Sequence, residues 1–285
     1  MIEPTGRRAM TRTRALAVTS GKGGVGKSTV AVNLAAALVA RGERVVLLDA
    51  DLSLANLDVL LELTPGMNLQ DVLEGRCGLH DAVRHGPAGL RVVPATQGNP
   101  RMSALSDLER AGLIQAFSDL GPELDWLVID TAAGMTPTTL QFCAAAQDVL
   151  IVVCDEPAAL ADACAMVRVL KDTGRRSRFR ILVNMVAAGE DPRVTFQRLV
   201  DLTETIAEVS LEYAGSVPYD RTVTAAAREG QPVVAAHPDA LVATAFTNLA
   251  RDTGRWPLPS TASGQSEFFW ENKIHNEVME RRARI

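Results

Sequence analysis

The sequence has little cysteine and no long apolar run, and each scarcity excludes a class of protein. Its 285 residues contain only four cysteines, with no Cys-x-x-Cys pair and no histidine at zinc-ligand spacing. A disulfide framework, a structural zinc site and an iron–sulfur cluster are therefore not expected, whereas reduced thiols in a cytoplasmic protein are. No uninterrupted apolar stretch approaches the roughly 20 residues that a membrane-spanning helix needs. The N-terminus is rich in arginine but lacks the apolar segment and cleavage site of a signal peptide.

Charge of neither sign dominates the chain. Its 29 lysines and arginines against 34 aspartates and glutamates give a formal net charge of −5, which argues against a protein that coats nucleic acid by bulk charge. Hydrophobic residues make up 47% of the sequence, too many for a disordered chain and enough for a sizeable core. Only four of the basic residues are lysines, and two of them, Lys22 and Lys27, lie in one short glycine-rich segment.

Continuous apolar runs alternate with amphipathic stretches along the chain. The runs predict strands that are buried on both faces of a parallel sheet, at residues 15–20, 44–49, 90–94, 126–130, 149–154, 179–184 and 213–217. The amphipathic stretches predict helices at residues 29–41, 107–120, 137–147, 158–172, 191–209 and 239–252. This order predicts an α/β fold with a doubly wound, mostly parallel sheet and helices on both faces. Ligands of such folds bind at the carboxyl ends of the strands.

The strand and helix pattern covers residues 15–253, which we expect to form one domain. Residues 1–14 are rich in arginine and poor in large apolar side chains, so we expect a disordered basic tail. The pattern then breaks into a stretch with proline, serine and glycine that is typical of a linker, over residues 254–266. Residues 267–285 are expected to form one more helix, which is amphipathic.

A phosphate-binding loop is the strongest motif in the sequence. Residues 21–28 read Gly-Lys-Gly-Gly-Val-Gly-Lys-Ser and stand between an expected strand and an expected helix, a context that a chance glycine-rich turn would lack. Glycines allow backbone N–H groups to surround an anion, and the helix N-terminus adds positive potential. Lys27 is expected to reach the β- and γ-phosphates of ATP, and Ser28 to bind Mg²⁺. The residues expected to contact the nucleotide here are Gly21, Lys22, Gly23, Gly24, Val25, Gly26, Lys27, Ser28 and Thr29.

Carboxylates follow two further expected strands. Asp49 and Asp51 come at the end of a buried run, where carboxylates are costly unless they face water or a cation. We expect Asp49 to lie near Mg²⁺, and Asp51 to orient the water that attacks the phosphate. Ordinary aspartates at a strand–loop junction are the alternative. Asp130 ends an apolar run in the Walker B pattern and is expected to hold Mg²⁺ through water.

Two further polar positions face the same expected edge of the sheet. Asn184 ends the run at residues 179–184, where its amide could pair with adenine through one donor and one acceptor. A capping or turn asparagine is the alternative. Asp155 and Glu156 follow the run at residues 149–154, and the sequence assigns them no role.

The order Lys-Gly-Gly-Val-Gly-Lys-Ser resembles the deviant Walker A motif of the MinD/ParA family of ATPases. The resemblance implies that Lys22 reaches across a dimer interface to sense the partner's γ-phosphate, while Lys27 acts within its own subunit. It also implies that Asn56 belongs to the switch I segment and Gly134 to the switch II segment. Pro218 stands where this family has a loop beside the base.

Further strings resemble the FleN/FlhG family of flagellar number regulators, across nearly all of residues 15–270. They lie at residues 73–77, 112–119, 130–134, 153–157 and 256–259. This resemblance implies a slow Mg²⁺-dependent ATPase that dimerises on ATP and restrains the flagellar master activator, an enhancer-binding AAA+ protein. Many relatives stimulate a flagellar GTPase through an N-terminal Asp-Gln-Ala-x-x-Leu-Arg motif, which residues 1–14 lack. A chromosome-partition or division-site positioning ATPase that binds DNA or membrane is the alternative, because it shares the nucleotide residues.

Two segments bear on that alternative. Within residues 267–285 one helical stripe is apolar, so reversible membrane contact competes with packing on the domain, and Phe268 and Phe269 could take part in either. The stripe consists of Trp270, Ile274, Val278 and Ile285. A basic cluster before a strand is interpreted as a solvated loop, with a nucleic-acid patch as the alternative. It consists of Arg175, Arg176, Arg178 and Arg180.

Overall fold

The computed structural model describes residues 13–52, 54–96, 102, 105–174, 176–257 and 267–269. Within these residues, eight strands form one sheet in the order β3-β4-β2-β5-β1-β6-β7-β8. They are β1 (Arg14–Thr19), β2 (Val45–Ala50), β3 (Arg84–His85), β4 (Arg91–Val93), β5 (Trp126–Thr131), β6 (Asp148–Val153), β7 (Arg178–Val186) and β8 (Ser210–Pro218). All neighbouring strands are parallel except β3 and β4, which form an antiparallel pair at one edge.

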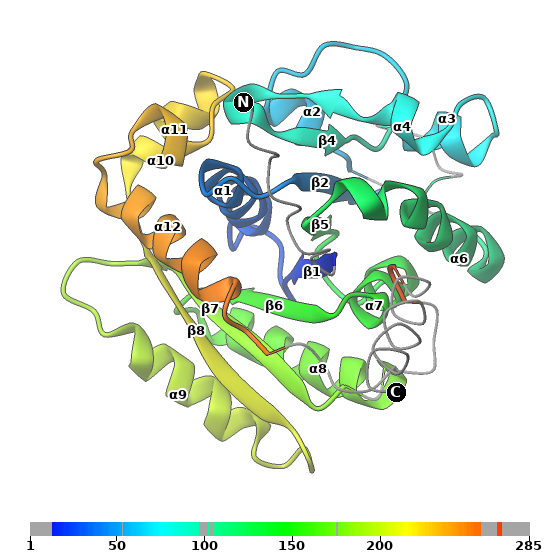
Figure 1. Cartoon of the computed structure of the whole chain (residues 1–285). Coiled ribbons are helices and arrows are strands. Elements are labelled where there is room, and N and C mark those ends of the chain that lie inside the picture. Colours follow the sequence, from blue (N-terminus) through cyan, green and yellow to red (C-terminus); the bar gives the residue numbers. More distant parts are fainter. Residues whose placement is uncertain are drawn as a thin grey trace, which may run out of the picture.

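Helices cover both faces of the sheet (Figure 1). One face carries α1 (Lys27–Ala40), α11 (Val233–Ala236) and α12 (Leu241–Thr253). The other carries α6 (Asp107–Ala116), α7 (Pro137–Ala145), α8 (Pro157–Gly174) and α9 (Pro192–Thr203). Shorter helices are α2 (Leu57–Leu60), α3 (Leu69–Leu73), α4 (Leu79–Ala82) and α10 (Arg221–Arg228), with 3₁₀ segments at Pro87–Gly89 and Phe117–Glu123.

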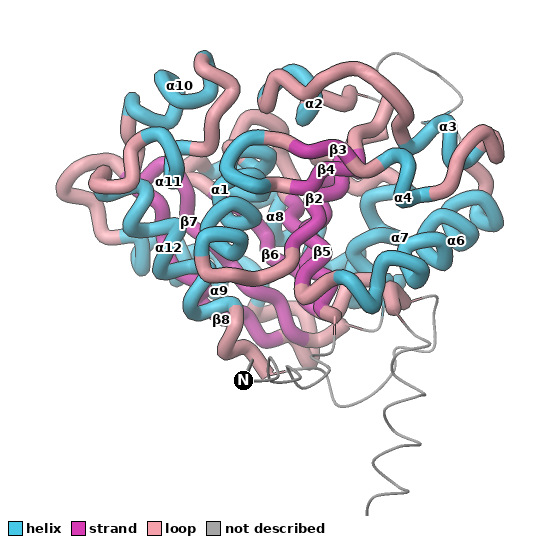
Figure 2. The backbone as a smooth tube through the Cα atoms, turned by 45° about the horizontal axis from the view of Figure 1, so that its top comes forward, coloured by secondary structure: helices cyan, strands magenta, loops and turns pink. Residues whose placement is uncertain are grey.

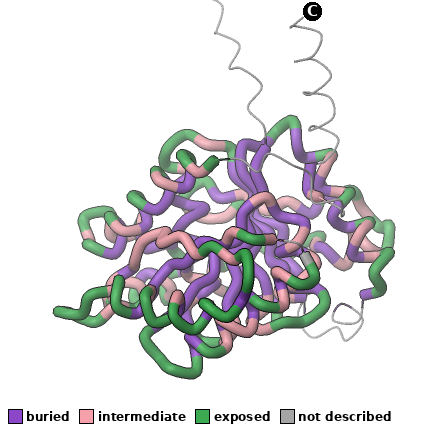
Figure 3. Tube along the Cα trace, turned by 90° about the horizontal axis from the view of Figure 1, so that it is seen from below, coloured by how far each residue is buried: buried purple, intermediate pink, exposed green. Residues whose placement is uncertain are grey.

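The strand residues alternate between two hydrophobic cores, one on each side of the sheet. Leu16 and Val18 of β1 pack in the core that contains α1, whereas Ala15 and Ala17 pack in the core that contains α7 and α8. Buried residues follow the strands through the middle of the molecule (Figure 3), and helices surround them (Figure 2). Burial on both faces explains why these strands appear in the sequence as continuous apolar runs.

The expected fold is confirmed, and all seven expected strands are present. The strand that the sequence did not reveal, β3, has only two residues. The helix expected at residues 107–120 ends early, because the chain continues as a 3₁₀ segment that contains Pro122. The helix expected at residues 191–209 ends at Thr203.

The first strand begins at Arg14, one residue before the expected start. The hydroxyl group of Thr13 donates to the carbonyl oxygens of Gly121 and Leu124 at 2.7 and 3.0 Å, so this residue is also anchored. Residues 13 and 14 therefore belong to the folded domain and not to the basic tail. Residues 1–12 lie outside the described residues.

Two residues of the basic cluster, Arg176 and Arg180, are engaged inside the domain. Arg180 is 5% exposed, and its guanidinium group pairs with Asp148 and Glu212. Arg176 donates to three carbonyl groups at the end of α7 and just beyond it, and burial lowers its pKa. Both a solvated loop and a nucleic-acid patch are therefore wrong for these two residues, because their charge is used inside the domain. Arg175 lies outside the described residues.

Phe268 packs on the domain. Its ring lies 5.6 Å from that of Phe117 and 6.1 Å from that of Phe142, measured between centroids. Its N–H donates to the carbonyl oxygen of Ala145 at 3.1 Å, and its own carbonyl accepts from the Gln147 amide at 2.9 Å. Of the two alternatives for this aromatic pair, packing on the domain is confirmed. The apolar stripe beyond it lies outside the described residues, and none of the described helices is long and apolar enough to cross a membrane.

Candidate nucleotide-binding site

The phosphate-binding loop joins β1 to α1 at the carboxyl edge of the sheet. Gly26 ends the loop with a φ of +83°, a left-handed conformation that favours glycine. An ideal Cβ at Gly26 would lie closer than 3.0 Å to the side-chain amide of Asn184. One at Gly21 would lie equally close to backbone atoms of Asp162 and Ala163 in α8. Close approach on two sides therefore requires glycine at both positions.

Lys27 and Asp130 form a buried ion pair beneath this loop. The Nζ atom of Lys27 lies 2.8 Å from Oδ1 of Asp130 and 3.5 Å from Oγ of Ser28. The two paired side chains are 8% and 1% exposed. Burial raises the pKa of Asp130, and the neighbouring ammonium group of Lys27 opposes that rise. The structure thus brings together the expected phosphate-binding lysine and the expected Walker B carboxylate.

The second carboxylate oxygen of Asp130 is suited to a cation. This Oδ2 atom is buried and, among the described residues, has no hydrogen-bond partner. The Ser28 side chain lowers the pKa of the same carboxylate group. Carboxylate and hydroxyl oxygens are ligands that Mg²⁺ accepts while it keeps several waters. Asp130 and Ser28 therefore fit the expected Mg²⁺, although their binding of it stays a prediction.

Asp49 accepts hydrogen bonds from the loop that follows β2. Its carboxylate is fully buried and accepts backbone N–H groups of Asp51, Asn56 and Leu57, each at 3.1 Å. Burial raises its pKa to about 7, with a further contribution from the charge of Asp130, and the three hydrogen bonds act against this rise. Asp49 therefore positions the following loop, and its expected approach to Mg²⁺ stays a prediction.

The resemblance predicts two switch segments, which follow β2 and β5: switch I at residues 47–56 and switch II at residues 128–134. In switch I, Asp51 is partly exposed, and its Oδ1 accepts from the N–H of Leu54 at 3.0 Å. In switch II, Gly134 has a φ of +81° and donates its N–H to the carbonyl oxygen of Ser20 at 2.9 Å. This bond links switch II directly to the start of the loop. The expected roles of Asp51, Asn56 and Gly134 toward phosphate and water stay predictions.

Asn184 and Pro218 lie at the ends of adjacent strands, as expected for a site at this edge. The register pairs Val186 of β7 with Pro218 of β8. The Nδ2 group of Asn184 donates to the carbonyl oxygen of Val25 at 2.8 Å, and the residue is 5% exposed. The NH₂ group of the Asn184 side chain therefore helps to hold the phosphate-binding loop in place. The contacts of Asn184 and Pro218 with adenine stay predictions.

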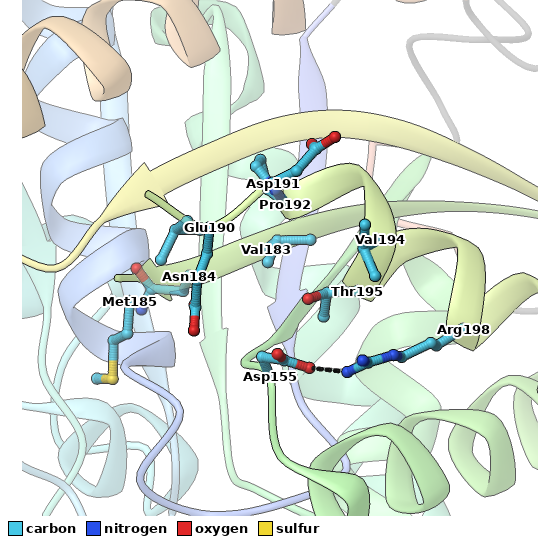
Figure 4. A pocket seen from close by; sticks show the side chains of 11 residues that line it. Asp155, Val183, Asn184, Met185, Glu190, Asp191, Pro192, Val194, Thr195 and Arg198 are labelled. Carbon is cyan, nitrogen blue, oxygen red and sulfur yellow. Dashed lines mark hydrogen bonds and ion pairs between the residues drawn. The ribbon is translucent and has the colours of Figure 1, made fainter. Parts of the chain in front are cut away.

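Two ion pairs beside the loop were not expected. The Nζ atom of Lys22 pairs with the carboxylate of Glu156, and Arg198 of α9 pairs with Asp155 at 2.8 Å. Asp155, Asn184 and Arg198 line a cavity of about 260 Å³, and their side chains approach it from three different elements (Figure 4). The sequence places both carboxylates at this edge. It contains no signal for their cations, which come from distant parts of the chain.

Comparisons with known proteins agree with this geometry. Residues 16–233 match the family described as the CobQ/CobB/MinD/ParA nucleotide binding domain. The antiactivator FleN of Pseudomonas aeruginosa is 48% identical over 92% of this chain and 93% of its own. The flagellum site-determining protein YlxH of Helicobacter pylori is 30% identical over 90% of this chain and 88% of its own. The structure of MinD with Mg-ADP from Pyrococcus horikoshii has a TM-score of 0.71 and 26% identity, over 85% of this chain and 96% of that one.

Proposed function

We propose that this chain, which belongs to the CobQ/CobB/MinD/ParA family of nucleotide-binding proteins, is a regulatory ATPase that limits flagellar number. The observation that carries the proposal is the similarity to an antiactivator over nearly the whole chain. The similarity to a flagellum site-determining protein points to the same process. In this proposal the cytoplasmic ATP-bound dimer binds and restrains the flagellar master activator, an enhancer-binding AAA+ protein.

The residues of the site supply the parts that phosphoryl transfer needs. Lys27 can exchange Asp130 for the phosphates of ATP, and Asp51 can orient the attacking water. Mg²⁺ held by Ser28 and Asp130 would neutralise charge on the β- and γ-phosphates. A switch depends on the lifetime of its ATP state, so we expect turnover well below about 10 s⁻¹, the median for enzymes.

Three variants test the switch mechanism. Lys27→Ala should lose both nucleotide binding and dimerisation, whereas Lys22→Ala should lose dimerisation more than binding. Asp51→Ala should trap the dimer, because hydrolysis is blocked while ATP binding survives. Binding of a fluorescent ATP analogue and gel filtration with ATP measure the two properties. An Asp51→Ala protein that runs as the same monomer with and without ATP would reject the switch mechanism.

The cellular role is tested by counting flagella. A strain that lacks this protein should make more flagella per cell than its parent, as counted by electron microscopy. Re-expression of the wild-type chain should restore the parental number, and the Lys27→Ala variant should not. A normal count in the deletion strain would reject the flagellar role and leave the ATPase chemistry standing.

A positioning ATPase is the second candidate, because the chain is also similar to MinD. The structure weakens its DNA-binding form, since Arg176 and Arg180 are engaged inside the domain. Retardation of non-specific DNA by the ATP form at moderate salt would favour this candidate. Sedimentation with anionic vesicles tests membrane contact through residues 267–285.

A further inference from the structure

Lys22 is held by its own subunit in this structure. Its ammonium group pairs with the carboxylate of Glu156, and the two side chains are 37% and 57% exposed. The hydrogen bond that Lys22 donates to Glu156 raises the pKa of the lysine, so the amine is protonated in the pair. Lys22 is expected to contact the nucleotide of a second subunit, but in this structure it already forms an ion pair with Glu156 of its own subunit.

The backbone at both ends of this contact lies next to α8. Gly21, which precedes Lys22, has no room for a Cβ because the backbone at Asp162 of α8 lies against it. Glu156 stands directly before α8, where its carbonyl accepts from the N–H of Leu160 at 3.1 Å. Its own N–H donates to the carbonyl oxygen of Cys154 at 2.8 Å, which closes a tight turn. The backbones on both sides are therefore fixed, and only the lysine side chain must swing to leave.

The surroundings of the pair are acidic. A cavity of about 300 Å³ next to the loop is lined by Lys22 together with Asp155, Glu156 and Glu190. Asp155 forms an ion pair with Arg198, whereas Glu156 forms one with Lys22. An ammonium group that leaves this cavity loses a favourable field and needs an anion elsewhere. The γ-phosphate of a partner subunit would supply such an anion.

We propose that Glu156 is a positioning residue that holds Lys22 on its own subunit in the resting monomer and so opposes ATP-dependent dimerisation. The inference rests on the proposed function, because it requires that Lys22 act across the dimer interface. Release of the lysine then becomes a step of dimerisation, and Glu156 sets how much ATP-bound protein is needed before dimers form.

The expected effect is moderate, because the pair is exposed. An exposed ion pair shifts an equilibrium by at most about fivefold. A two-fold symmetric dimer must release two such lysines, so the dissociation constant of the dimer should change by up to about 25-fold. An effect of this size sets a threshold without making the dimer inaccessible.

The test measures dimer dissociation constants of the full chain by sedimentation with a non-hydrolysable ATP analogue. Glu156→Gln should tighten the dimer several-fold, whereas Glu156→Asp, which keeps the charge, should stay closer to wild type. Asp155→Asn is the matched control, since it removes the same charge from the adjacent residue without touching Lys22. It should change the dissociation constant less than Glu156→Gln does, because Asp155 pairs with Arg198. Equal binding of a fluorescent ADP analogue by all variants would show that the loop is intact.

A second measurement reports on the ion pair without a dimer. In the nucleotide-free monomer, Lys22 should react faster with an amine acylating reagent in Glu156→Gln than in wild type or Asp155→Asn, as followed by peptide mass spectrometry. A Glu156→Gln dimer that is as weak as wild type, or weaker, overturns the inference while the switch stands. If wild type stays monomeric with the analogue at every concentration, and Asp51→Ala with ATP does too, the proposed function fails and the inference fails with it.

Discussion

The two edges of the same sheet carry buried charge in different ways. At the amino-terminal edge, Asp148 lies between Arg14 at 2.6 Å and Arg180 at 3.4 Å, and Arg180 also pairs with Glu212. At the carboxyl edge, Lys27 meets Asp130, one of whose oxygens has no partner among the described residues. At the amino-terminal edge, each carboxylate is shared between two cations. At the carboxyl edge, one oxygen of Asp130 has no hydrogen-bond partner in the described part of the chain.

Aromatic rings complete the difference. At the amino-terminal edge, the guanidinium of Arg14 lies 4.6 Å from the ring centroid of Trp126, and that of Arg180 lies 4.1 Å from the centroid of Trp256. These rings cover the faces of cations that each have one buried N–H group without a hydrogen bond to the described part of the chain. Among the described residues at the carboxyl edge, the glycine-rich phosphate-binding loop, and not an aromatic ring, lies beside the ion pair of Lys27 and Asp130. A charge that is covered stabilises the fold, whereas a charge beside an open loop can be exchanged for a ligand.

The largest effect is expected at the covered edge. Asp148→Ala would leave Arg14 and Arg180 buried without their shared carboxylate, so we expect a loss of about 3–5 kcal/mol in the free energy of unfolding. Urea denaturation measures the loss. The affinity of the folded protein for ATP should stay unchanged, because the nucleotide site lies at the opposite edge.

Asp252→Ala is the control for this prediction. Asp252 pairs with Arg251 and Arg255, but the side chains are exposed, so removing it should cost less than about 1 kcal/mol. Equal losses in the two variants would show that burial does not distinguish these ion pairs, and the comparison between the edges would lose its basis.

The second effect concerns the open edge. Gly21→Ala places a Cβ against the backbone of Asp162, so the phosphate-binding loop must shift away from α8. We expect nucleotide affinity to fall on the order of 100-fold, about 2.7 kcal/mol, because the loop binds through the positions of its N–H groups. Titration calorimetry with ADP measures it. Unchanged affinity would mean that the contact with α8 does not position the loop.

The architecture and most of the site could be predicted from the sequence because their signals are local. Apolar runs mark strands buried on both faces, and the ends of parallel strands meet at one edge. This is why Asp130 and Asn184 could be assigned to one edge before the structure was known, whereas Pro218 was assigned there from the family resemblance. The two residues of β3 carry too little pattern to be recognised.

The pairing of charges could not be predicted, because it depends on segments that meet only in the fold. Arg180 belongs to a run of basic residues in the sequence, yet its partners Asp148 and Glu212 lie on neighbouring strands. Asp49 shows the same limit, since its three N–H donors come from the conformation of the loop that follows it. Residue type predicts which side chains carry chemistry, and only the fold decides which of them are already occupied.

The third prediction concerns the pH dependence of stability that Asp49, at the carboxyl edge, should cause. Burial raises the pKa of Asp49 to about 7, so between pH 4 and 7 the folded protein holds a proton that the unfolded chain has released. Raising the pH through this range should therefore lower the stability of the nucleotide-free protein. One such group contributes at most about 1.4 kcal/mol per pH unit. Asp49→Asn should flatten the profile measured by urea denaturation, and parallel profiles for the two proteins would contradict the assignment.

The smallest effect is expected in α6, where a glycine-to-alanine substitution should raise the stability of the protein and leave nucleotide affinity unchanged. Gly112 lies within α6, is exposed, and has no atom within 4 Å of an ideal Cβ. Alanine there reduces the freedom of the unfolded chain without a clash, so Gly112→Ala should stabilise the protein by up to about 1 kcal/mol. Thermal unfolding measures the gain, and ADP affinity should match wild type. If Gly112→Ala also weakened ADP binding, the loss in Gly21→Ala could no longer be ascribed to the contact with α8, because a glycine with free space around it would behave in the same way.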